Sequence, residues 1–202
     1  MLGGALLFGW IAVAAEPFSH KLHLKLVAKC TDCHTAAATS TKVDDNLLPA
    51  ASACVRCHAA GVVIREPEPT AVARFSHQQH LKFGNVSKVI ASAIDRKSYL
   101  SPPGDLRRQL DTQNPCGACH RGLEESDAVT HAALPKMADC LVCHSKIDPP
   151  DSCVTCHSKS LVLKPVSHDE GFFSNHSSGK LNLDRTSCAV CHGRRFTCLG
   201  CH

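Results

Sequence analysis

The feature that most constrains this 202-residue chain is a five-residue unit, Cys-x-x-Cys-His, which occurs seven times. The units use all fourteen cysteines of the sequence: Cys30, Cys33, Cys54, Cys57, Cys116, Cys119, Cys140, Cys143, Cys153, Cys156, Cys188, Cys191, Cys198 and Cys201. Their histidines are His34, His58, His120, His144, His157, His192 and His202. This spacing is typical of c-type haem attachment, in which two thiols form thioether bonds and the adjacent histidine ligates the iron. The sequence therefore predicts seven covalently bound haems.

Two other interpretations of the paired cysteines are weaker. Zinc ribbons also contain cysteines separated by two residues, but they need no histidine directly after every second cysteine. A disulfide framework suits an exported chain, yet it leaves the seven adjacent histidines unexplained. Haem attachment accounts for every member of the unit.

Seven further histidines lie outside the units, and their number equals that of the predicted haems. They are His20, His23, His77, His80, His131, His168 and His176. A lone histidine is usually a surface residue, but the equality of the two counts predicts a second imidazole ligand for each iron. An iron with imidazole on both faces is six-coordinate and low-spin, so it has no vacant position for a substrate.

The length of the chain limits what kind of core it can build. There are only about 29 residues for each predicted haem, too few to surround every ring with an ordinary apolar core. We therefore expect the haems to form the core, with the thioether and iron bonds as cross-links. The predicted fold is mostly irregular and small α, with a haem-filled core, short helices joined by loops, and little or no sheet.

The first fifteen residues are apolar and contain no charged side chain. They are similar to the apolar part of a secretory signal, and Ala12-Val13-Ala14 offers a cleavage site of small residues. The stretch is shorter than the roughly 20 apolar residues of a bilayer span. Residues 1–15 are thus predicted to be a signal peptide or a short N-terminal membrane anchor. Either one places the haems in the periplasm or elsewhere on the oxidising side of a membrane.

The formal charge of +4 does not predict a nucleic-acid partner. Each haem brings two propionates, and seven haems would reverse the sign of the total. Basic side chains are expected to pair with propionates or with solvent. We therefore expect no nucleic-acid binding.

An internal repeat, Phe-Ser-His-x-x-His-Leu-Lys, begins at Phe18 and again at Phe75. A helix would place both histidines of each copy on one face, because positions three apart are neighbours. Two adjacent imidazoles could then ligate two different irons. The Pro-rich stretch at 65–69 predicts a linker between the copies. We expect a two-haem module at 16–66, a three-haem module at 67–163 and a two-haem C-terminal module at 164–202.

One longer helix is predicted after the second copy of the repeat. Val86, Val89, Ile90 and Ile94 have helical spacing and indicate an amphipathic helix that packs on a haem face. The Ser-Pro-Pro-Gly stretch at 101–104 is expected to break it.

The order of motifs over residues 75–157 resembles the small three- and four-haem periplasmic cytochromes of the class III multihaem family. The chain departs from that family by a long insertion between His80 and Cys116. The resemblance implies that His77 serves the haem of Cys116, His80 that of Cys140 and His131 that of Cys153. By analogy, His20 and His23 would serve the haems of Cys30 and Cys54, in that order or across modules. The tail is similar to the two-haem C-terminal segment of larger multihaem cytochromes, with His168 and His176 as distal ligands.

These features favour an electron-transfer protein over an enzyme. Its partners would be redox proteins: a membrane quinol-oxidising donor and a periplasmic or extracellular acceptor. One alternative is a multihaem reductase of the nitrite, hydroxylamine or sulfite type with one open haem, and Met137 could replace a histidine at another. A second is a haem subunit of a membrane redox complex, attached through residues 1–15. A third is a homo-oligomer or extracellular cytochrome filament.

The haem count is directly testable. We expect the intact mass of the purified protein to exceed that of the polypeptide by seven haems, because every Cys-x-x-Cys-His unit carries one. Electron paramagnetic resonance (EPR) of the oxidised protein should show low-spin ferric iron. A mass corresponding to six or fewer haems would contradict the prediction.

Overall fold

The computed structural model describes residues 18–59, 70–110, 113–144, 153–165, 168–176, 178, 180 and 185–192. Within these residues the α-helices are α1 (His20–His23), α2 (Ala51–Cys54), α3 (His77–Leu81), α4 (Ser87–Asp95), α5 (Leu106–Gln109), α6 (Met137–Leu141), α7 (Phe172–Asn175) and α8 (Arg185–His192). Short 3-10 helices are η1 (Cys30–Asp32), η2 (Thr35–Ala38), η3 (Pro115–Ala118), η4 (Leu123–Glu125), η5 (His131–Ala133) and η6 (Cys153–Thr155).

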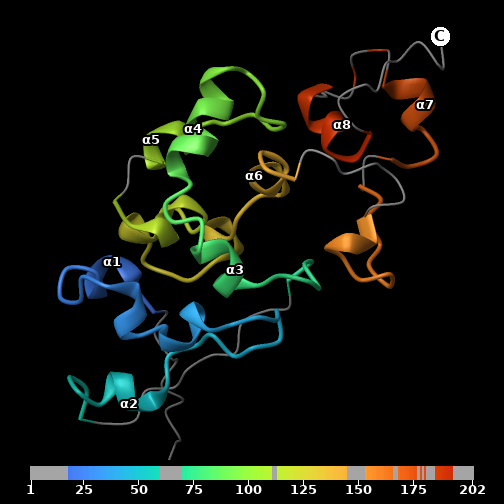
Figure 1. The fold of residues 1–202 in the computed structure, drawn as a ribbon. Helices are drawn as coiled ribbons and strands as arrows, with labels where there is room; N and C mark the ends of the chain where they lie inside the picture. Colours follow the sequence, from blue (N-terminus) through green and yellow to red (C-terminus); the bar gives the residue numbers. More distant parts are fainter. Residues whose placement is uncertain are drawn as a thin grey trace, which may run out of the picture.

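Short helices and loops make up this part of the chain, and the predicted fold class is confirmed. The only strand-like pairing among the described residues is an isolated antiparallel bridge between Val72 and His157. Helices α1 and α2 lie toward one end of the molecule and α7 and α8 toward the other, with α3 to α6 between them (Figure 1). Helices of one or two turns are not stable alone in water, so contacts outside each helix must hold them.

The two copies of the repeat form α1 and α3 in the same way. Ser19 and Ser76 are their N-caps, and each hydroxyl oxygen accepts a hydrogen bond of 3.3 Å from the backbone N–H three residues later. Such a cap satisfies a backbone donor that a short helix cannot pair internally. Each helix therefore presents two histidines three residues apart, as the sequence predicts.

Helix α4 carries the one apolar cluster of the described residues. Ile90 and Ala93 are buried there with Tyr99, Leu106 and Leu110. The amphipathic helix predicted from the sequence is therefore present. It packs on protein side chains, although Val86, Val89 and Ile90 also line the cavity described below.

The end of α4 differs from the prediction. The helix stops at Asp95, well before the Pro-Pro pair at 102–103. Lys97 adopts a left-handed conformation with φ of 55°, and the backbone N–H groups of Ser98 and Tyr99 both bond to the carbonyl of Ala93. A left-handed residue that closes the last turn in this manner is a common helix stop, and a lysine there gives little sequence signal.

A buried ion pair joins the third and fourth motifs. The guanidinium of Arg121, next to His120, contacts the carboxylate of Asp139, next to Cys140, and their side chains are only 5% and 4% exposed. Asp139 also accepts hydrogen bonds from the hydroxyl of Tyr99 at 2.9 Å and from the backbone N–H of Lys136 at 2.7 Å. The carboxylate and its partners thus fix the start of α6 against the third motif.

Some segments with a predicted role lie outside the described residues. The leader at 1–15 and the Pro-rich linker at 65–69 are among them, so the module boundaries stay predictions. In the part of the chain that is described, no helix has the length and apolar character needed to cross a bilayer.

The buried ion pair generates a stability prediction. Replacing Asp139 by Asn leaves the Arg121 charge buried without its partner and should destabilise the haem-loaded protein by about 3–5 kcal/mol. The matched control is Asp95→Asn, which breaks the exposed Asp95–Arg107 pair, where the side chains are 56% and 50% exposed. That change should cost at most about 1 kcal/mol. Guanidinium unfolding followed by haem absorbance measures both, and equal losses would contradict the expectation.

Candidate haem-binding site

The Cys-x-x-Cys-His motifs share one local geometry. In the first five motifs, the histidine N–H bonds to the carbonyl of the first cysteine at 2.8–3.0 Å, and the second cysteine N–H bonds to the same carbonyl at 3.1–3.3 Å. The sixth motif ends α8. One tight helical turn therefore brings two thiols and an imidazole to one side of the chain. The seventh motif, Cys198 to His202, lies outside the described residues.

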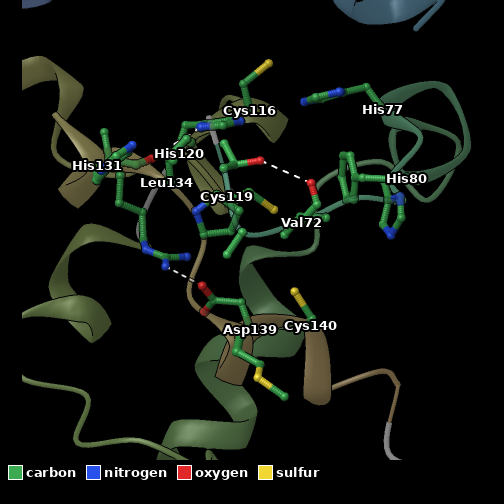
Figure 2. Close-up of a pocket in the computed structure, with 18 of the residues that line it drawn as sticks. Val72, His77, His80, Cys116, Cys119, His120, His131, Leu134, Asp139 and Cys140 are labelled. Carbon is green, nitrogen blue, oxygen red and sulfur yellow. Dashed lines mark hydrogen bonds and ion pairs between the residues drawn. The ribbon is translucent and has the colours of Figure 1, made fainter. Parts of the chain in front are cut away.

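Five of the six described motifs line a common cavity of about 4530 Å³. Typical ligand pockets have volumes of roughly 300–1,000 Å³, so this space is large enough for several cofactors. Figure 2 shows His77, Cys116 and His120 along one part of it, and Asp139 near Cys119 and Cys140. Among the six described motifs, that of Cys54 contributes no residue to the lining.

Five of the spare histidines face motif histidines across this part of the structure. The distances between ring centroids lie between 6.1 and 6.3 Å in every case. The pairs are His20–His34, His23–His58, His77–His120, His80–His144 and His168–His192.

This distance is the one that a shared iron requires. Imidazole nitrogens bind metals at about 2 Å, and a five-membered ring with bonds of about 1.35 Å has its centroid about 1.15 Å from each atom. Two imidazoles on opposite faces of one iron thus have centroids about 6.3 Å apart. Directly stacked rings would be closer, as Phe18 and His23 are at 4.3 Å. The residues present therefore fit bis-imidazole haem.

Hydrogen bonds at Nδ1 orient many of the rings. Nδ1 of His23 and of His80 each lies 2.8 Å from the carbonyl oxygen of the residue four positions earlier. The corresponding acceptors are the carbonyls of Leu47 for His34, Ala133 for His120, Ala71 for His157 and Phe172 for His176. A carbonyl accepts a hydrogen bond only from a protonated nitrogen, so Nδ1 carries the proton and Nε2 keeps its lone pair for a metal.

Burial keeps three of the rings neutral. It lowers the pKa of His20, His77 and His120 below the ordinary value of 6.5, because a charged ring loses solvation there. The Nδ1 atoms of His20 and His77 are buried and make no hydrogen bond to the described residues. A neutral imidazole is the form that binds a metal.

Two of the motif thiols have raised pKa values. Burial raises the pKa of Cys116 and Cys119, and the nearby Asp139 adds to the shift at Cys119. All twelve described cysteines are free, and no three of the described His, Cys, Asp or Glu residues gather as a metal-ion site. The thiols of the described motifs are therefore available for thioether bonds.

Among the described residues, five of the seven predicted distal histidines lie opposite a motif histidine. The rings expected at the haems of Cys116 and Cys140 lie opposite those motifs, and His20 and His23 lie opposite His34 and His58, in that order. His131 lies in η5, whose Ala133 bonds to the ring of His120, whereas His157 bonds to Ala71 ahead of α3. The His131–His157 pairing thus stays a prediction. So does the role of His176, since His202 lies outside the described residues.

Sequence reasoning missed two groups that support the site. Phe18, Phe75 and Phe172 stack on His23, His80 and His168 with ring centroids 4.3–4.4 Å apart. The phenylalanine that opens each repeat was the available signal. The second group is the side-chain amide of Asn114, which bridges two motifs. Its oxygen accepts a hydrogen bond from the N–H of Cys116, and its NH₂ group lies 3.0 Å from the sulfur of Cys30.

Comparison with known proteins adds one finding. Residues 25–202 match the family model described as outer membrane cytochrome MtrC/MtrF-like, domains II/IV. The match agrees with a multihaem c-type cytochrome; it does not extend to the class III family that the order of motifs resembles, nor to the number of haems. No curated protein and no solved structure matches.

The ring planes generate a spectroscopic prediction. The His20–His34, His77–His120 and His168–His192 rings are within 14° of parallel, whereas His23–His58 and His80–His144 are tilted by 36° and 46°. Parallel imidazole planes separate the energies of the iron orbitals that hold the unpaired electron, and crossed planes separate these energies less. EPR of the oxidised protein should therefore contain at least three rhombic low-spin signals and two more anisotropic ones. A single uniform class of signal would contradict this geometry.

Proposed function

Because the chain belongs to the family of MtrC/MtrF-like outer membrane cytochromes, we propose that it relays single electrons along seven covalently bound, bis-histidine c-type haems. A haem held by the cysteines and histidines of these motifs would supply one-electron chemistry, because haem iron is stable in both the ferric and the ferrous state. The observation that carries the proposal is the recurrence of one imidazole spacing, 6.1–6.3 Å, in five separate pairs of histidines.

Side chains and backbone carbonyls have four roles in this proposal. The cysteines attach the macrocycles, and the paired histidines hold the irons with Nε2. The backbone carbonyls at Nδ1 fix the tautomer and orientation of the rings, which also makes the ligands more basic. The stacked phenylalanines restrict the orientation of three of the rings.

The same geometry argues against a reductase at the paired sites. Reduction of a small oxyanion at haem needs an iron with one open face. Where two imidazoles share an iron, both axial positions are filled. We therefore favour an electron carrier over an enzyme, with no substrate bound at these five sites.

Partners and location follow from the same proposal. The family name places its members at an outer membrane, and thioether haem chemistry belongs to an oxidising compartment. We propose that a membrane quinol-oxidising protein supplies the electrons and that a periplasmic or extracellular redox protein accepts them. A haem subunit of a larger complex or filament would use the same residues.

Opening one iron tests the proposal. Replacing His80 by Gly removes one distal imidazole, so the oxidised protein should gain one haem equivalent of high-spin ferric iron that binds cyanide. The control is Gln79→Ala, an exposed neighbour on α3 that contributes no ring. It should stay fully low-spin, as should the unmodified protein. Cyanide binding by the unmodified protein at a paired site, or an unchanged low-spin spectrum for His80→Gly, would contradict the proposal.

A further inference from the structure

The two copies of the repeat exchange equivalent hydrogen bonds. The backbone N–H of Lys21, in α1, bonds to the carbonyl of Ser126 at 3.1 Å, and that of Gln78, in α3, bonds to the carbonyl of Ser40 at 2.9 Å. Lys21 and Gln78 are equivalent, since each follows the first histidine of its copy. Ser126 and Ser40 are equivalent as well, because each lies ten residues after the first cysteine of a motif.

Other contacts repeat the relationship. The cap hydroxyls of Ser19 and Ser76 lie 3.5 and 3.4 Å from the same two carbonyls. Within each copy, the motif histidine bonds through Nδ1 to the carbonyl thirteen residues later, Leu47 for His34 and Ala133 for His120. An interface in which i contacts j while the equivalent of j contacts the equivalent of i has two-fold symmetry. The copies are therefore related by a pseudo-two-fold axis.

The first and third motifs meet near this axis. Asn114 joins them: its amide nitrogen lies 3.0 Å from the sulfur of Cys30, and its oxygen accepts the N–H of Cys116 at 2.9 Å. Burial and then the neighbouring Cys30 raise the pKa of the Cys116 thiol. The thiol that anchors one haem is thus close to the thiol that anchors the other.

We propose that Cys30 and Cys116 hold their haems edge to edge across this axis, so that the junction between the repeats is the electron path between them. This inference rests on the proposed function. His20 and His23 connect the haems of Cys30 and Cys54 through one helix, and His77 and His80 connect those of Cys116 and Cys140 through another. In space, the four haem sites therefore follow the order Cys54, Cys30, Cys116 and Cys140. In the sequence, the site of Cys30 comes before that of Cys54.

The position of the Cys54 site agrees with this order. Cys57 and His58 are exposed, and the motif lies outside the common cavity. The side chain of Arg56 bonds to the carbonyl of Asp32, inside the first motif. The second motif in the sequence thus lies against the first, at one end of the array.

A pair of double variants tests the junction. Methionine in place of a distal histidine raises the potential of its haem, so the two altered haems of each variant are reduced first. In His20→Met/His77→Met these are the haems proposed to touch. Repulsion between charges about 10 Å apart should make the second electron about tenfold harder to add. The control, His23→Met/His80→Met, alters the symmetry-equivalent outer sites, where screening should leave less than about a twofold effect.

Spectroelectrochemical titration at the sulfur–iron absorption band measures both variants, with the four single variants as references. The junction is supported if the second reduction is shifted, relative to the single variants, only in His20→Met/His77→Met. It is overturned if both double variants show the same reduction potentials as the single variants. The unmodified, fully reduced protein supplies a second readout: nuclear Overhauser effects between the thioether groups at Cys30 and Cys116 are expected, and their absence overturns the inference. A single variant that loads its haems but lacks the sulfur–iron band contradicts the histidine ligation of the proposed function, and the Overhauser effects then decide the junction independently.

Discussion

The separation of paired imidazole rings is the constraint on which the rest of the structure depends. Five pairs keep their centroids 6.1–6.3 Å apart, although their histidines come from helices, turns and loops. The short helices alone cannot fix this spacing. N-caps, carbonyls that bind Nδ1 and phenylalanine rings that stack on imidazoles each help to hold some of the pairs. Each of these contacts restricts one ring against its partner.

The buried contacts between protein side chains lie beside the third and fourth motifs and connect them. The apolar cluster around α4 is small, and the buried Arg121–Asp139 pair lies at its border beside the third and fourth motifs. Buried charges are tolerated only when they are fully paired, and here Tyr99 and Lys136 complete the shell of Asp139. This network ties α6, which carries Cys140, to the turn that carries His120. The neighbouring sites therefore cannot shift independently.

Much of the site could be predicted from the sequence, because the spacing of residues along the chain determines it. The motif turns and the histidines three apart in α1 and α3 follow from residue spacing, and the rings expected to oppose His120 and His144 do lie opposite them. The contacts between repeats were not accessible, since the Ser40 and Ser126 carbonyls act through the backbone and carry no side-chain signal. The stop of α4 at Asp95 depends on a left-handed lysine, which sequence rarely marks. Asn114 acts across 84 residues, a separation that only the fold reveals.

The brevity of the helices has a consequence for biogenesis. Helix α1 contains four residues and α3 contains five, whereas an isolated helix needs about 12–15 residues to persist in water. Before any cofactors are attached, the described part of the chain has few elements able to form by themselves. We therefore expect haem attachment and folding to be coupled, as in metal-dependent small domains that are unfolded without their ion. An extended nascent chain also leaves each Cys-x-x-Cys-His segment accessible to the enzyme that joins it to haem.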